Sequence, residues 1–175
     1  MNSIIFGFLL AMVIPLAAKQ EYQLGPWLIV NDTVMGGLSQ SNVESKEGSL
    51  VFSGALSLDN NGGFASTRAA FEPRFSERIT KVLIEVEGDG REYQLRFRTN
   101  RRLDGPAYAV KFSTEKDQLM RFEYSSKDFQ ATYRGYAISD PRRLSFDEIR
   151  QMGFLIADKN EEPFRLVVKS VTFKN

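Results

Sequence analysis

The side chains able to do chemistry in this sequence are oxygen-bearing groups that gather in loops beside glycines. Three short runs carry them: Asn-Asp-Thr at 31–33, Asp-Asn-Asn at 59–61 and Gly-Asp-Gly at 88–90. Loop oxygens of this kind are the ligands that Ca²⁺ takes in proteins. Asp and Asn also form tight turns, because their side chains hydrogen-bond to nearby backbone. We therefore predict turns without a bound metal or cofactor, and keep calcium as the alternative.

The absence of two residue types limits the reactions that this chain could catalyse. Neither cysteine nor histidine occurs among its 175 residues. This excludes disulfides, thiol nucleophiles, Ser-His-Asp triads and imidazole-bound zinc. A carboxylate enzyme such as a glycosidase needs two acids facing each other across about 5–9.5 Å. Glu85 and Glu87 instead point the same way from one predicted strand, so we predict a protein that is not an enzyme and has no catalytic residues.

The charge balance argues against a nucleic-acid partner. The formal net charge is +1, from 23 Lys and Arg against 22 Asp and Glu. Binding to phosphate backbones requires clustered excess cations. The densest basic pairs are Arg101–Arg102 and Arg142–Arg143, which are typical of a solvated surface.

Two glycine pairs stand out, in Asn-Asp-Thr-Val-Met-Gly-Gly-Leu-Ser at 31–39 and Asp-Asn-Asn-Gly-Gly-Phe-Ala-Ser at 59–66. Glycine permits positive φ and close approach of another backbone. Neither run has the spacing of a phosphate-binding loop. We predict turns that set where Met35 and Phe64 enter the core.

Alternation of apolar and polar residues dominates the chain from residue 27 onward. In the stretch 92–99, Tyr93, Leu95 and Phe97 alternate with charged or polar residues, as in a strand with one buried face. Strands are predicted at 52–58, 81–87, 92–99, 107–113, 119–124, 130–138, 153–157 and 164–173. Many short strands separated by Gly- and Asn-rich turns predict an all-β, antiparallel β-sandwich.

One short helix is predicted near 145–151. Ser145 and Glu148 have the spacing of a capping box, and Leu144 and Ile149 have the spacing of a hydrophobic staple.

The first 18 residues contain no charged side chain and include an apolar run from Ile4 to Ala18. This pattern is typical of a secretory signal peptide that is removed after export. The run falls short of the ~20 residues that span a membrane, and an uncleaved membrane anchor is the alternative. We therefore expect a signal peptide at 1–18, a single domain at 19–175 and a periplasmic or secreted protein.

Taken in order, several motifs resemble those of the complex I intermediate-associated protein 30 family. The motifs are Trp27, VNDTVMGGLS at 30–39, FSGALSLDNNGGFAS at 52–66, GDGREYQLRFRT at 88–99, YAVKF at 108–112, YRGY at 133–136, GFLIADK at 153–159 and PFRLVVKSV at 163–171. The resemblance covers nearly the whole mature chain. It implies a jelly-roll sandwich of the galactose-binding-like type, and a role in assembling respiratory complex I through protein contacts.

The resemblance also carries over a set of signature positions, without assigning them ligand or catalytic roles. They are Trp27, Asn31, Asp32, Met35, Gly36, Gly37, Ser39, Gly62, Gly63, Phe64, Ser66, Arg68, Gly88, Asp89, Gly90, Tyr93, Arg98 and Tyr108. An export leader differs from the transit sequence of a mitochondrial member, so the domain here is open to another partner.

Two functions follow as hypotheses. The first is a non-enzymatic assembly domain that binds a protein, such as a subunit of a membrane respiratory complex, through an apolar patch that includes Trp27 or Phe64. The second is a carbohydrate or small-ligand module, in which loop polar groups bind hydroxyls and an aromatic ring stacks on the sugar. Its candidates are Trp27, Asn31, Asp32, Arg68, Asp89 and Arg98. We also predict an ion pair between Asp89 and Arg68 or Arg98.

Overall fold

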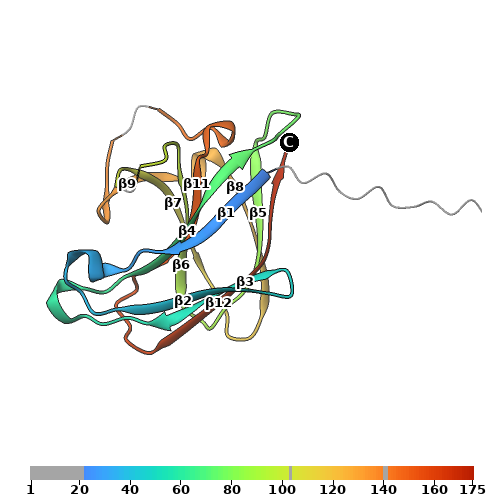
Figure 1. Ribbon diagram of the computed structural model, residues 1–175. Coiled ribbons are helices and arrows are strands. Elements are labelled where there is room, and N and C mark those ends of the chain that lie inside the picture. The colour runs from blue at the N-terminus through green and yellow to red at the C-terminus, as the bar shows by residue number, and fades with distance from the viewer. Residues whose placement is uncertain (1–21, 103, 140–141) are drawn as a thin grey trace, which may run out of the picture.

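Two antiparallel sheets packed face to face make up the computed structural model, which describes residues 22–102, 104–139 and 142–175 (Figure 1). The seven-stranded sheet has the order β1-β4-β11-β6-β7-β9-β10, and the five-stranded sheet has the order β2-β3-β12-β5-β8. This confirms the predicted all-β sandwich. The predicted signal peptide at 1–18 lies outside the described residues. Within those residues, no helix is both long and apolar enough to cross a bilayer.

The strand bounds are as follows. In the seven-stranded sheet they are β1 Tyr22–Ile29, β4 Ala65–Pro73, β6 Glu92–Arg98, β7 Ala107–Ser113, β9 Gln130–Tyr133, β10 Tyr136–Ala137 and β11 Gln151–Ile156. In the five-stranded sheet they are β2 Gln40–Lys46, β3 Ser49–Ala55, β5 Lys81–Glu87, β8 Leu119–Ser125 and β12 Pro163–Lys174. Four short 3₁₀ helices lie between them: η1 Asp32–Met35, η2 Asp59–Asn61, η3 Ser126–Asp128 and η4 Phe146–Glu148.

The predicted helix is a single 3₁₀ turn. Only Phe146–Glu148 is helical, and β11 begins at Gln151. The predicted capping box does not form, because the Ser145 side chain makes no cap hydrogen bond. Phe146 and Ile149 are instead buried in the core. The backbone conformation that buries both side chains is not that of a longer helix.

The alternating side chains fill the space between the sheets with aromatic rings. Phe52 and Phe97 come from opposite sheets and both are fully buried. The ring of Phe97 lies 5.2 Å from that of Phe129, and Phe146 meets Phe173 edge-on at 5.8 Å. Such tilted contacts suit the aromatic quadrupole and add to the hydrophobic gain. The core therefore depends on the alternation that the sequence displays.

The outward side chains of the seven-stranded sheet form what we call the outer face. Strand register aligns Arg68 of β4, Gly153 of β11 and Arg96 of β6 in one row across it. Leu28 of β1 continues the row beyond Arg68. At the edge of this sheet, β1 shifts register between Leu24 and Trp27, where the chain reads Gly-Pro.

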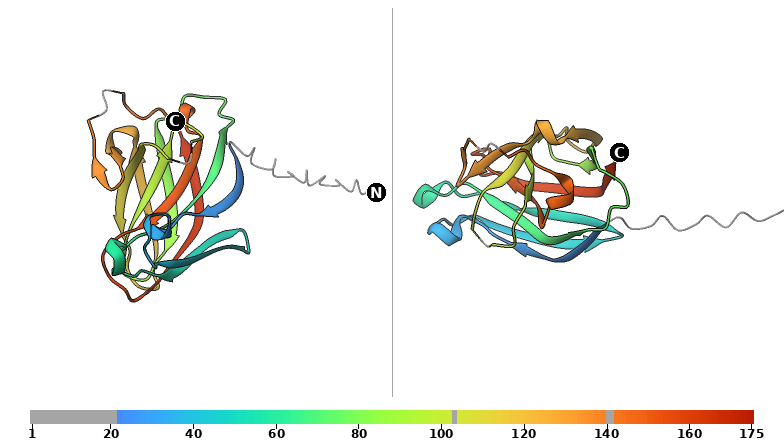
Figure 2. Two further views of the ribbon diagram at one scale, coloured as in Figure 1. Left: turned by 60° about the vertical axis from the view of Figure 1, so that its left-hand side comes forward. Right: turned by 90° about the horizontal axis from the view of Figure 1, so that it is seen from above.

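The loops that contain η1 and η2 project side by side from one end of the sandwich (Figure 2). Each loop carries one of the glycine pairs. The structure therefore brings together two motifs that are about 25 residues apart in the sequence.

Replacing Phe97 by Ala is expected to lower the free energy of unfolding by about 3–5 kcal/mol, because it opens a cavity among packed rings. Urea denaturation would measure the loss. The matched control is Leu119→Ala at a side chain that is 57% exposed, where we expect a change within about 0.5 kcal/mol. Equal effects of the two variants would contradict the assigned core.

Candidate functional site

The two projecting loops are joined by the side chain of Asp32, which is 1% exposed. Its carboxylate accepts hydrogen bonds from the backbone N–H of Ser39 at 3.0 Å and from the Ser39 hydroxyl. It also accepts the backbone N–H groups of Gly63 at 2.7 Å and Phe64 at 3.3 Å. One buried carboxylate thus ties the end of β1, the start of β2 and the start of β4 together.

Asn31 completes this junction from the neighbouring position. Its side-chain amide donates to the carbonyl of Ser39 at 3.3 Å. Its side-chain oxygen accepts the Ser41 hydroxyl at 2.9 Å and the backbone N–H of Ser66 at 3.3 Å. Both polar side chains of the Asn-Asp pair are therefore used inside the fold.

The glycine pairs are explained by the Asp32 junction. A Cβ on Gly37 would lie 2.4 Å from Cγ of Asp32, and a Cβ on Gly62 would lie 2.6 Å from its Oδ2. The other member of each pair has positive φ, +91° at Gly36 and +119° at Gly63. In each pair, one glycine makes room for the carboxylate and the other turns the chain.

Hydrogen bonding decides the charge state of Asp32. Burial by itself raises the pKa of this carboxyl, but the hydrogen bonds from Ser39, Gly63 and Phe64 outweigh burial and hold the pKa below its ordinary value of 3.8. The charged form is the one that accepts four donors. Asp32 is therefore an ionised structural group at neutral pH.

The surface of the two loops is apolar. Val34 is 68% exposed, Met35 69%, Leu38 54% and Leu58 42%; we call these four side chains the apolar tip. The expectation that Met35 enters the core is wrong, because it points into solvent, whereas Phe64 is half-buried. The side chain of Asn60 donates to the carbonyl of Gly36 at 3.1 Å, which links the two loops near their ends.

Trp27 does not lie on an exposed surface of the loops. It is half-buried, packs against the core, and its ring centroid lies 6.2 Å from that of Phe154. The ring therefore belongs with the interior face of the sheet and not with a stacking platform beside the loop polar groups.

The predicted ion pair of Asp89 with Arg68 or Arg98 is wrong. The Asp89 carboxylate accepts the Tyr93 hydroxyl at 2.8 Å and the backbone N–H groups of Arg91 and Arg165. It stands at the start of β6, whereas Arg98 is the last residue of that strand. An ion pair next to the Gly-Asp-Gly turn is made instead by Arg91, whose Nε donates a hydrogen bond to Asp158 at 2.9 Å.

Sequence reasoning missed Arg96 and Gly153. Together with Arg68 and Arg98, Arg96 forms what we call the arginine row on the outer face, and Gly153 separates Arg68 from Arg96 without a side chain. The signal was available in the alternation of 92–99, which places Arg96 and Arg98 on the same face of one strand.

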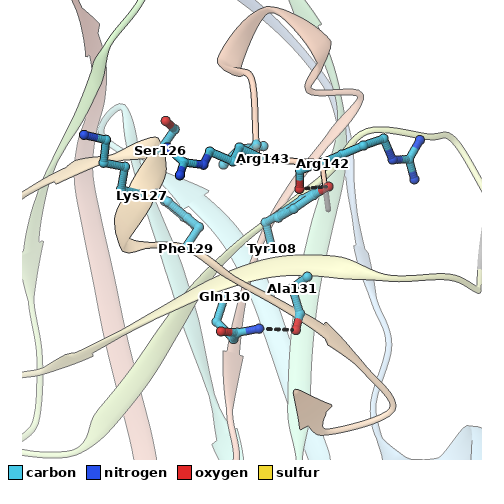
Figure 3. A pocket seen from close by; sticks show the side chains of 9 residues that line it. Tyr108, Ser126, Lys127, Phe129, Gln130, Ala131, Arg142 and Arg143 are labelled. Atoms are coloured by element: carbon cyan, nitrogen blue, oxygen red, sulfur yellow. Dashed lines mark hydrogen bonds between the residues drawn. The ribbon is translucent and has the colours of Figure 1, made fainter. Parts of the chain in front are cut away.

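A cavity of about 360 Å³ lies beside β7 and β9 (Figure 3). It is lined by the buried side chains of Tyr108, Phe129 and Leu144 and by the exposed Lys127 and Arg143. Of the signature positions, only Tyr108 lines this cavity. Among the described residues, no group of three or more acidic side chains is placed to hold a metal ion.

Asp32→Asn is expected to lower the free energy of unfolding by about 3 kcal/mol at neutral pH, because an amide cannot accept all four donors and loses the charge. Asp59→Asn, an exposed site in the η2 loop, is the control and should change stability by less than about 0.5 kcal/mol.

The stability difference between the wild type and Asp32→Asn should also depend on pH. A carboxylate with a lowered pKa contributes stability that is complete above about pH 5 and is lost as the pH falls through the folded-state value. Urea midpoints measured from neutral pH to below the ordinary value should therefore converge in acid. A gap that widens in acid would contradict the assigned charge state.

Comparisons with known proteins place this geometry in a family. A family model described as complex I intermediate-associated protein 30 matches residues 16–168. No curated protein matches the chain at a significant level.

Solved structures share the fold. A family 11 carbohydrate-binding module from Clostridium thermocellum, in complex with a β-1,3-1,4-mixed-linked tetrasaccharide, superposes with a TM-score of 0.57 at 13% identity, over 85% of this chain and 88% of that one. A solution structure of the CtCBM11 module gives a TM-score of 0.56 at 12% identity, over 90% and 97% of the two chains. At these identities the likeness shows the fold alone, a jelly-roll sandwich of the carbohydrate-binding-module type. Because the family model covers most of the sequence, the chain belongs to the complex I intermediate-associated protein 30 family.

Proposed function

We propose that this chain is a non-catalytic assembly-factor domain that binds a protein partner outside the cytoplasm through the apolar tip. Family membership supports an assembly role, since the family is described by its association with an intermediate of complex I. The observation that carries the proposal is the exposure of Val34 and Met35 on a loop junction fixed by Asp32.

The apolar tip has the properties of a binding surface. Of the eight large apolar side chains that are most exposed among the described residues, six come from residues 28–38 and 58. Clustered exposed apolar side chains on a soluble domain mark interaction surfaces, whereas single ones are ordinary. Burying one Val or Met fully contributes about 1.5–3 kcal/mol, so this cluster can supply much of the free energy of an interface.

The rigidity of the loops favours binding further. Ordering a mobile loop on binding costs free energy, which a preformed loop avoids. The hydrogen bonds to Asp32 and the Asn60–Gly36 link already fix the two loops relative to each other. A partner therefore meets apolar side chains whose backbone is already in place.

A carbohydrate site built from the residues first considered is less well supported. Asn31 and Asp32 use their side chains within the loop junction. Asp89 is bound to Tyr93 at the start of β6, and Trp27 packs on Phe154. These groups do not converge around one concave surface, as sugar recognition would require.

The double variant Val34→Ser/Met35→Ser tests the proposal. It should leave stability nearly unchanged, because both side chains are exposed, while it removes the apolar contact area. Affinity capture from the envelope fraction, followed by quantitative mass spectrometry, is expected to recover respiratory-complex subunits with the wild type and to lose them with the variant.

The matched control for that experiment is Leu119→Ser, at another exposed apolar residue, in the five-stranded sheet. It should capture the same subunits as the wild type. Loss of capture with Leu119→Ser alone, or capture of glycans in place of subunits, would overturn the proposed surface.

The proposed location is tested at the N-terminus of the mature protein. Removal of the signal peptide after Ala18 should leave Lys19 as the first residue. Mass spectrometry of the protein purified from the periplasm or the medium would read this directly. A cytoplasmic protein that retains Met1 would contradict export, and a membrane-bound one with Met1 would identify the leader as an anchor.

A further inference from the structure

Two members of the arginine row, Arg96 and Arg98, form no ion pair within the described residues. The side chain of Arg98 is half-buried, yet it makes no hydrogen bond or ion pair within the described part of the chain. Arg96 makes one bond, from Nη2 to the hydroxyl of Thr132 at 3.3 Å. The Nε atoms of both residues are buried and have no acceptor among the described residues. A desolvated donor without an acceptor destabilises the fold.

The charges of the row also act on one another. Burial, then Arg96 and then Arg68 lower the pKa of Arg98 to about 10, while Asp104 acts in the opposite direction. Arg98 nevertheless stays protonated at neutral pH. The Asp104 carboxylate is 64% exposed and is bound to Arg134 at 3.0 Å and to the Tyr133 hydroxyl at 3.1 Å. Its charge is therefore shared with a cation outside the row.

Small residues flank Arg96 on both neighbouring strands. Gly153 lies between Arg68 and Arg96, and Ala109 lies on the other side of Arg96. A Cβ on Gly153 would lie 2.4 Å from the carbonyl oxygen of Thr67, so this position admits no side chain. No large side chain therefore separates Arg96 from the neighbouring strands.

We propose that Arg96 and Arg98 form a binding site for the carboxylates of an acidic, extended segment of the protein partner. The two arginines are two residues apart on β6, which spaces their side chains by about 7 Å on one face. Acidic residues at alternate positions of an extended segment have the same spacing. Guanidinium groups bind carboxylates with paired, charge-assisted hydrogen bonds.

The position of the row favours a protein segment as the occupant. Leu28, 51% exposed, stands beside Arg68 in the same row, and β1 then leads through Ile29 to η1. The row thus reaches β1, whose chain leads on to the apolar tip, the protein-binding surface on which this inference rests. Acidic residues next to apolar ones would cover both parts of this surface.

The test is fluorescence anisotropy with a labelled ten-residue peptide of alternating Glu and Thr, at physiological salt. The wild type should bind it and should not bind the matching Gln-Thr peptide. Arg96→Gln/Arg98→Gln should weaken binding about a hundredfold, tenfold for each arginine. Polygalacturonate, a polyanion of sugar acids, is the competing arm.

Controls separate the site from general charge and from folding. Arg121→Gln/Arg165→Gln removes the same charge from exposed positions of the five-stranded sheet and should leave the affinity nearly unchanged. The urea midpoint of Arg96→Gln/Arg98→Gln should equal or exceed that of the wild type, because like-charge repulsion is relieved. Arg98→Gln alone serves as the second variant if the double variant does not fold.

Three outcomes would overturn the inference: undiminished peptide binding by the arginine variants, equal loss in the control variant, or tighter binding of polygalacturonate than of the peptide. Val34→Ser/Met35→Ser should still bind the peptide. If that variant also captures subunits like the wild type, the apolar tip fails as the protein-binding surface while the arginine site stands. If the arginine variants bind the peptide but Val34→Ser/Met35→Ser loses capture, the arginine site fails while the apolar tip stands as the protein-binding surface.

Discussion

The loop end of this molecule depends on one buried carboxylate. The Asp32 carboxylate accepts hydrogen bonds from two other chain segments, at Ser39 and at Gly63–Phe64. The free energy of a buried charge is tolerable only when such donors are present. Two consequences follow from this constraint. The segments cannot move independently, and the residues next to the carboxylate must be small, which accounts for Gly37 and Gly62.

On the outer face, in contrast, a charged side chain is left without hydrogen-bond partners within the part of the chain that the structure describes. Asp32 is surrounded by donors, whereas Arg98 has neither an acceptor nor an ion-pair partner in the described residues. Elsewhere in the fold a buried arginine is fully used: Arg91 donates to Asp158 and to the carbonyls of Glu162 and Asn160. Within one small sandwich, the Arg91 side chain is therefore fully hydrogen-bonded, whereas that of Arg98 is not.

How far the sequence predicts the structure depends on the range of the interactions. Strands such as Lys81–Glu87 and Ala107–Ser113 match their predicted bounds, because alternation and burial are local properties of the chain. The helix near 145–151 was overpredicted, since burial of Phe146 and Ile149 outweighed the local capping signal.

The sites were harder to predict than the strands. The Asp32 junction joins residues more than 30 positions apart, and the arginine row depends on which strand lies beside β6. Spacing in the sequence contains neither fact. The sequence therefore predicted the wrong partner for Asp89. It also predicted that Met35 enters the core, whereas its side chain is exposed.

The register shift in β1 has a consequence for how any partner can attach. Strand β1 is an edge of the seven-stranded sheet, and such an edge invites another chain to extend the sheet by backbone pairing. Pro26 has no N–H to offer, and the irregular backbone around Gly25 interrupts the ladder. A continuous ladder of backbone hydrogen bonds to an added strand is therefore interrupted at this border, which disfavours sheet extension between separate copies.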